Sequence, residues 1–289
     1  MAGKKALLVG INKFANYSQF TLNGCVNDAK DMAALHKDLL GFKAGEITTL
    51  TDAKATKANI MSNLKTMVAD AKSGKLSYLV FSLSSHGTQM NDTSGDEPDD
   101  MDEAFVPYDI AEKGGGWDPA HIISDDELHD LFVQLPAGAL LEVYLDTCHS
   151  GTGLRGADFG PHAPRARYIA PPEQEFGRKT ARMRGFTLSR PPSSNAKKGA
   201  VAAGKGVAAG AHHTLWTGCK ANETSADAYF DGRYNGAFTY YYLKVVRETQ
   251  NKLSRKDVVA KMRTLMKGKF AQNPQLEANA SNRAQAIVY

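Results

Sequence analysis

The chain has 289 residues, of which 35 are Lys or Arg, 31 are Asp or Glu and 42% are hydrophobic. This length and composition suit one large α/β domain with a substantial core and exclude a disordered chain. Cys25, Cys148 and Cys219 lie far apart without a CxxC pair, which excludes a disulfide framework and a zinc site and favours the reducing cytoplasm. No apolar run reaches the roughly 18 residues of a membrane span, so we expect no membrane partner.

The net charge of +4 is concentrated in one segment. Residues 155–210 contain 11 Lys and Arg against 3 Asp and Glu, whereas the rest of the chain contains 24 against 28. The segment is also rich in Pro and Gly and has little apolar periodicity, so we predict a mobile linker there. It would join a larger part, residues 1–154, to a smaller part, residues 211–289, of a single domain spanning residues 1–289. Because the positive charge is confined to this linker, we expect no nucleic-acid partner.

Strand and helix signals alternate along the chain. Short apolar runs predict strands, and apolar residues at helical spacing predict helices. This alternation predicts an α/β fold with a largely parallel central sheet flanked by helices on both faces. In chain order we predict a strand at 6–11, a helix at 28–40, a strand at 47–50, a helix at 58–71, a strand at 76–83, a helix at 125–135, strands at 140–145 and 213–218, a helix near 238–246 and a helix from residue 254.

Two predicted strands lead directly into reactive side chains. One is followed by His86 and Gly87, and the other by Asp146 and Cys148. The carboxyl ends of parallel strands meet at one edge of a sheet, so we expect His86 and Cys148 to meet as general base and nucleophile. The backbone amides of Gly87 and Cys148 would then hold a developing oxyanion.

Seven runs of sequence resemble metacaspases and their prokaryotic relatives, the orthocaspases, of the caspase clan. They extend over nearly the whole chain outside the linker. The resemblance implies a caspase-haemoglobinase fold and a cysteine endopeptidase whose dyad is His86 and Cys148, with no cofactor required for the chemistry. The signature of animal caspases around the nucleophile is absent, which argues against cleavage after Asp. The runs are GCVNDA, SLSSHGTQ, GDEPDDMDEAFVPYD, ISDDEL, LDTCHSG, FTYYYL and NPQLE.

An acidic pocket is expected beside the nucleophile. Asp146 and Ser84 each lie two residues before a member of the dyad, so strand alternation directs each toward the same face as that member. A carboxylate there suits the side chain of Lys or Arg, and Arg can bind it bidentately. The resemblance implies that Asp28 and Asp146 are the pocket's acids and that Cys25 and Ser84 form its walls. Taken without the resemblance, Asp28 is also a typical residue of a helix's first turn.

The acidic stretch between residues 92 and 103 offers oxygen ligands of the kind that Ca²⁺ prefers, although it lacks the EF-hand pattern. Such a stretch is otherwise simply a solvated loop. Many metacaspases use calcium to order the active-site loops, and the positions that best match are Asp99, Asp102, Asp125 and Asp126. The chain departs from the family in having Arg155 where another acidic ligand is typical. Calcium activation and calcium independence therefore both stay open.

The linker carries the side chains that an acidic pocket would bind. Caspase-like enzymes are commonly cut between their large and small parts, so our hypothesis is that Cys148 cuts this segment, in cis or in trans. The alternative is an uncut, disordered tether. The candidate cleavage residues are Arg165, Arg167, Arg178, Lys179, Arg182, Arg184 and Arg190.

Other functions predict different sequence features. A catalytically silent homologue acting as a regulatory binding module would be expected to lack the Cys or the His, and a protease of other specificity would lack the acidic pocket. A G-x-G-x-x-G pattern begins at Gly151, but Pro161 and Pro164 follow where a dinucleotide site needs a helix. We predict a cytoplasmic monomer that cleaves proteins or peptides after Arg or Lys.

Overall fold

The computed structural model describes residues 2–91, 101–148, 163–172, 213–220 and 223–287. Its centre is a six-stranded sheet in the order β14-β11-β9-β3-β1-β2, parallel except for β14, which runs antiparallel to β11. This confirms the predicted α/β class with a largely parallel sheet. The strands are β1 (Gly3–Gly10), β2 (Ile47–Thr51), β3 (Leu76–Ser84), β9 (Leu140–Asp146), β11 (His213–Thr217) and β14 (Gln275–Glu277).

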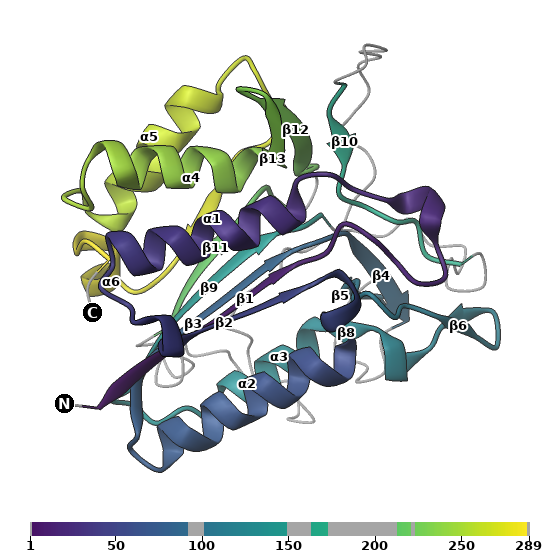
Figure 1. The fold of residues 1–289 in the computed structure, drawn as a ribbon, viewed down its shortest axis with the longest axis horizontal. Helices are drawn as coiled ribbons and strands as arrows, with labels where there is room; N and C mark the ends of the chain where they lie inside the picture. The colour runs from purple at the N-terminus through teal and green to yellow at the C-terminus, as the bar shows by residue number, and fades with distance from the viewer. Residues whose placement is uncertain (1, 92–100, 149–162, 173–212, 221–222, 288–289) are drawn as a thin grey trace, which may run out of the picture.

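Helices cover both faces of the sheet (Figure 1). One layer contains α1 (Cys25–Asp38), α4 (Ala237–Glu248) and α5 (Arg255–Met266), with the short α6 (Ala280–Ala284) beside α5. The other layer contains α2 (Lys57–Lys72) and α3 (Asp125–Phe132). The helices predicted from apolar spacing are all present, although α3 ends three residues before its expected end. Among the described residues, no helix combines the length and the apolar character that crossing a membrane requires.

The core consists of two apolar clusters, one on each side of the sheet. Ala6 and Leu8 of β1 belong to the cluster beneath α1, α4 and α5, whereas Leu7 and Val9 belong to the cluster against α2 and α3. Successive side chains of a strand point to opposite faces, so a strand covered on both faces is apolar throughout. This is why β1 was predictable as a continuous apolar run, whereas β14 of the same sheet was not predicted.

Short strands that the sequence did not predict lie beyond the carboxyl ends of the central strands (Figure 1). Three small sheets contain them, and most of their residues are polar or half-exposed. The strands are β4 (Gly87–Asn91), β5 (Met101–Phe105), β8 (Ile123–Ser124), β6 (Glu112–Lys113), β7 (Gly116–Trp117), β10 (Arg165–Ala166), β12 (Ala226–Phe230) and β13 (Arg233–Gly236).

Part of the predicted linker is ordered. Residues 163–172, here called the docked segment, include β10, which pairs antiparallel with β12. The expectation of a structureless linker is therefore wrong for these ten residues, because they gain backbone hydrogen bonds from a strand that only the fold brings near. The remainder of 155–210 lies outside the described residues.

Candidate active site

The two strands that lead into the expected dyad are direct neighbours. β3 pairs with β9 in parallel, and the register places Ser84 opposite Asp146 at the end of the ladder. His86 and Cys148 each follow two residues later, and both are almost completely buried. The sheet thus brings both residues to one edge, as expected for strands with a common carboxyl end.

The ring of His86 lies between Phe14 and Phe20, and its Nε2 is 2.7 Å from the Phe20 carbonyl oxygen. Burial lowers the pKa of His86 to about 4, so the imidazole is neutral at pH 7. A neutral ring that donates from Nε2 carries its basic lone pair on Nδ1. This tautomer, assigned from the hydrogen bond, leaves Nδ1 as the nitrogen able to accept a proton.

The thiol of Cys148 lies against the backbone of Ser225, just before β12. Its Sγ is 3.2 Å from the Ser225 carbonyl oxygen and 2.5 Å from the Ser225 nitrogen. Cys219 is close by, with its Sγ 3.7 Å from the Thr147 carbonyl oxygen. The neighbouring Cys148 thiol, together with burial, raises the pKa of Cys219 well above its ordinary value.

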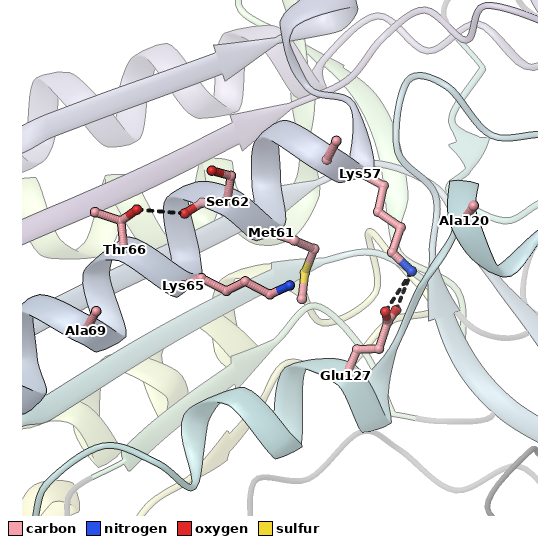
Figure 2. A pocket seen from close by; sticks show the side chains of 9 residues that line it. Lys57, Met61, Ser62, Lys65, Thr66, Ala69, Ala120 and Glu127 are labelled. Atoms are coloured by element: carbon pink, nitrogen blue, oxygen red, sulfur yellow. Dashed lines mark hydrogen bonds and ion pairs between the residues drawn. The ribbon is translucent and has the colours of Figure 1, made fainter.

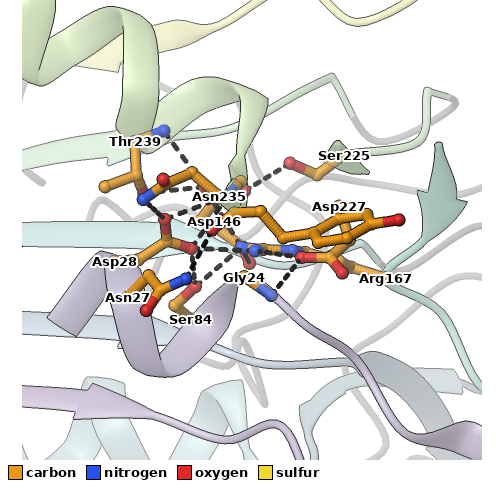
Figure 3. A network of polar contacts seen from close by, with 12 residues as sticks. Gly24, Asn27, Asp28, Ser84, Asp146, Arg167, Ser225, Asp227, Asn235 and Thr239 are labelled. Atoms are coloured by element: carbon orange, nitrogen blue, oxygen red, sulfur yellow. Dashed lines mark hydrogen bonds and ion pairs between the residues drawn. The ribbon is translucent and has the colours of Figure 1, made fainter. Parts of the chain in front are cut away.

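The expected acidic pocket is present and is filled by Arg167 of the docked segment (Figure 3). One terminal nitrogen, Nη2, is 2.8 Å from Asp28 Oδ2 and 2.9 Å from Asp227 Oδ1. The other, Nη1, is 2.6 Å from Ser84 Oγ and 3.2 Å from Asp146 Oδ2. Arg167 and the three aspartates are all at most 2% exposed. Three buried carboxylates thus surround one buried guanidinium, which is the pairing that buried charges require.

Asp28 is fixed by groups other than the arginine. The Gly236 amide and the Asn235 side chain donate to it, and so does the Ser84 hydroxyl at 2.6 Å. Burial and the nearby Asp146 raise the pKa of Asp28 to about 6, against the opposing effect of Arg167. At pH 7 its carboxyl is therefore mainly ionised.

Asp146 is held in the same way by the start of α4. The backbone N–H of Thr239 donates to Asp146 Oδ2 at 3.1 Å and the Thr239 hydroxyl donates at 2.7 Å, while the Ser225 hydroxyl donates to Oδ1. A Cβ on Gly236 would overlap both Asp146 and Arg167, so glycine is needed for this close approach. The acids are thus oriented by the fold itself.

Cys25, the expected wall residue, begins α1 and is fully buried. Burial raises the pKa of its thiol well above the ordinary value, partly offset by the charge of Arg167. The four residues expected to form the pocket, Cys25, Asp28, Ser84 and Asp146, therefore lie together.

Asp227 is the pocket residue that the sequence analysis missed. It accepts hydrogen bonds from the amides of Asn23 and Gly24 at 2.8 and 2.9 Å, in addition to its contact with Arg167. It lies on β12, a strand that was not predicted. The available signal was the alternation of Ser225 and Asp227 with small apolar residues, which is typical of a short half-buried strand.

The backbone of Arg167 occupies the position expected for a reacting carbonyl group. Its carbonyl oxygen accepts hydrogen bonds from the Gly87 amide at 2.9 Å and the Cys148 amide at 3.2 Å, the two donors expected to form an oxyanion hole. Its own amide donates to the Ser225 carbonyl oxygen at 3.1 Å. The chain on either side is extended, with β10 on β12 before it and a bridge between Tyr168 and Gly87 after it. The segment therefore lies as an extended peptide across the end of the sheet.

A second acidic group lies at the N-terminus of α3. Oxygen atoms of Asp102, Asp125 and Asp126 all lie within 4.8 Å of one another. Ser124 and Glu127 form a capping box there, and the first-turn acids favour the helix dipole. Three converging carboxylates fit the oxygen donors that Ca²⁺ takes. Asp99, the fourth expected ligand, and Arg155 lie outside the described residues.

A separate groove of about 640 Å³ lies between α2 and α3 (Figure 2). Its charged centre is the ion pair of Lys57 and Glu127, with Lys57 Nζ 2.7 Å from Glu127 Oε2. Its other lining residues are Ala58, Met61, Ser62, Lys65, Thr66, Ala69 and Ala120. No residue of the dyad or of the acidic pocket lines this groove.

Comparisons with known proteins point to one family. Residues 4–156 match the family model described as metacaspase, peptidase C14 domain. Metacaspase-1 from Scheffersomyces stipitis is 33% identical over 299 residues, covering 96% of this chain and 70% of the relative. Metacaspase-1 from Meyerozyma guilliermondii is 32% identical, with 96% and 69% covered.

Solved structures show the same fold. A crystal structure of a protein from Geobacter sulfurreducens aligns with a TM-score of 0.65 and 26% identity, covering 99% of this chain and 98% of that one. Caspase-1 from Spodoptera frugiperda aligns with a TM-score of 0.56 and 13% identity, covering 96% of this chain and 86% of that one. The likeness to a caspase confirms the expected caspase-haemoglobinase fold.

Proposed function

Because the chain belongs to the metacaspase family of cysteine peptidases, which act on proteins, we propose that it cleaves peptide bonds after Arg or Lys with His86 and Cys148. The observation that carries the proposal is Arg167, whose side chain fills the acidic pocket while its carbonyl oxygen accepts from Gly87 and Cys148. These two hydrogen bonds support the proposal, because they hold the carbonyl oxygen as an oxyanion hole would.

The proposed reaction is acyl transfer in two steps. Cys148 Sγ attacks the carbonyl carbon of the basic residue, and the thiol proton moves to His86 Nδ1. The Gly87 and Cys148 amides stabilise the oxyanion, and His86 returns the proton to the leaving nitrogen as the C–N bond breaks. Water, deprotonated by His86, then hydrolyses the thioester and restores the thiol.

The preference for a basic residue rests on charge. Three carboxylates, Asp28, Asp146 and Asp227, are buried around one cationic side chain. Removing a neutral side chain from water into this pocket would leave the acids buried without a counter-charge, which is costly. Neutral and acidic residues at this position should therefore be rejected.

Self-processing within the linker is part of the proposal, and the bond between Arg167 and Tyr168 is the candidate. Arg165 has an exposed side chain whose guanidinium donates to the Thr21 carbonyl oxygen, so among the described residues it does not enter the pocket. The other candidates, Arg178, Lys179, Arg182, Arg184 and Arg190, lie outside the described residues.

We propose that Ca²⁺, where it acts, binds the carboxylates of Asp102, Asp125 and Asp126. Asp102 lies on β5, which pairs with β4, and β4 begins at Gly87 next to His86. A cation that holds β5 to α3 would therefore steady the strand carrying one oxyanion donor. We further propose a monomer in the cytoplasm, where its three unpaired cysteines would stay reduced.

A fluorogenic peptide panel that differs only in the residue before the cleaved bond tests this function, with and without Ca²⁺. The full chain should release the fluorophore after Arg and Lys, at least about a hundredfold faster than after Asp or Ala. Cys148→Ala should abolish release. If no peptide is cleaved and Cys148→Ala behaves as the unaltered chain, the proposal is wrong and the alternative of a regulatory binding module is favoured.

A further inference from the structure

The residues that follow Arg167 are held as closely as those that precede it. Tyr168 forms a parallel bridge with Gly87, and the Ile169 amide donates to the Gly87 carbonyl oxygen at 3.0 Å. The peptide beyond the candidate bond therefore runs beside the start of β4. Backbone contacts of this kind fix where each following side chain must point.

Burial along this stretch alternates. Tyr168 is half-buried, Ile169 is 1% exposed, Ala170 is exposed and Pro171 is buried. Ile169 belongs to the apolar cluster between the sheet and the α2 and α3 layer. A side chain from a segment that is not part of the central sheet thus reaches the core of the domain.

We propose that the enzyme has an apolar subsite for the second residue after the cleaved bond, the place that Ile169 holds. Its substrates would then be proteins in which an aliphatic residue lies two positions after Arg. The inference rests on the proposed function, since this place is a subsite only if the bond after Arg167 is the one cleaved.

The two residues before Arg167 are less buried than Ile169, so the site constrains their side chains less. Arg165 is exposed, Ala166 is half-buried, and β10 pairs with β12 through backbone atoms that every residue type provides. Within residues 165–170, the buried side chains are therefore those of Arg167 and Ile169. Because the subsite binds the leaving fragment, it assists formation of the acyl-enzyme and plays no part in its hydrolysis.

Quenched fluorescent octapeptides that copy residues 164–171 test the subsite with the full chain. Glutamine replaces the exposed Arg165 so that one arginine remains. Replacing the isoleucine with aspartate should lower kcat/KM by at least about tenfold, because an apolar site must then take a charge. Replacing the next residue, alanine, with aspartate is the matched control and should change kcat/KM by less than about threefold.

A fluorogenic peptide that ends at Arg separates this inference from the proposed function. If that peptide is cleaved while both aspartate octapeptides react as fast as the parent, or both are equally slowed, the subsite is refuted and the proposed function stands. If neither it nor the parent octapeptide is cleaved after Arg, the proposed function fails and the subsite fails with it.

Discussion

Arg167 presents two terminal nitrogens to the pocket, and each contacts a different pair of side chains. Nη2 lies between Asp28 and Asp227, whereas Nη1 lies between Ser84 and Asp146. The ammonium of a lysine is a single compact charge and cannot reach both pairs from one position. We therefore expect the enzyme to prefer Arg over Lys, with Asp227 contributing to the preference.

Asp227→Asn tests this at the level of one atom group. The substitution removes the carboxylate charge that faces Nη2 of a bound arginine. It keeps one oxygen that can accept a hydrogen bond from a backbone amide. We expect kcat/KM for an Arg peptide to fall by about tenfold or more, equal to about 1.4 kcal/mol, and that for a Lys peptide to fall less. The measurement is kcat/KM on paired Arg and Lys peptides.

Asp231→Asn is the matched control, because Asp231 lies in the turn of the same hairpin and contacts only the exposed hydroxyl of Tyr240 among the described partners. It should leave the ratio of Arg to Lys unchanged. An unchanged ratio in Asp227→Asn as well would contradict a role for Asp227 in specificity.

At the scale of elements, most of the strands that could be predicted from the sequence are buried on both faces of the central sheet. The strands at 76–83 and 140–145 were predicted because burial on both faces favours mainly apolar runs. Their shared carboxyl edge then placed His86 near Cys148 without further information. β10 and β12 carry no such pattern, since two-residue or half-exposed strands owe their form to a partner strand. The sequence therefore predicted the pocket's acids on long elements and missed Asp227 on a short one.

The pairing of β10 with β12 makes one bond of the linker the expected site of self-cleavage. We expect mass spectrometry of the active full chain to find fragments ending at Arg167 and beginning at Tyr168. Arg167→Gln should abolish this cut because glutamine offers the pocket no charge, whereas Arg165→Gln should leave it in place because that side chain is exposed. Loss of the cut in Cys148→Ala would identify the chain's own thiol as its cause.

The opposite pattern would count against this site. A cut after Arg167 that persists in Cys148→Ala would assign it to another protease. Cuts confined to Arg178 or to residues beyond it would mean that the docked segment is bound but never cleaved.

At the scale of the whole molecule, the larger and smaller parts of the chain share one sheet. β11 of the smaller part pairs with β9 of the larger part, and β9 is the strand that leads to Cys148. Beneath this junction the buried Glu142 of β9 forms an ion pair with Arg255 at the start of α5. The pocket likewise draws Asp28 from one part and Asp227 from the other. Sequence spacing alone could not show this, because the contacts join residues about 200 positions apart.

Burial of His36 makes the stability of this shared fold depend on pH. The ring is fully buried near the end of α1, with Nδ1 2.7 Å from the Met32 carbonyl oxygen and the ring packed on Phe42. Burial, reinforced by the charge of Lys4, lowers the pKa of His36 from 6.5 to about 4. Between these values the unfolded chain binds more protons than the folded one. Stability is therefore full above pH 6.5 and is lost as the pH falls toward 4.

We expect protonation of His36 to lower the free energy of unfolding by about 2 kcal/mol when the pH falls from 7.5 to 5.0. Denaturant unfolding of Cys148→Ala, which cannot cut itself, measures the loss at the two pH values. The double variant with His36→Phe added keeps an apolar ring against Phe42 but removes the titrating group. The free energy of unfolding that this double variant loses should therefore be smaller by about 2 kcal/mol. The buried acids with raised pKa values, such as Asp28 and Glu142, act in the opposite direction but equally in both variants, so they cancel in the difference. Equal losses in the two variants would show that His36 is not a source of the acid sensitivity.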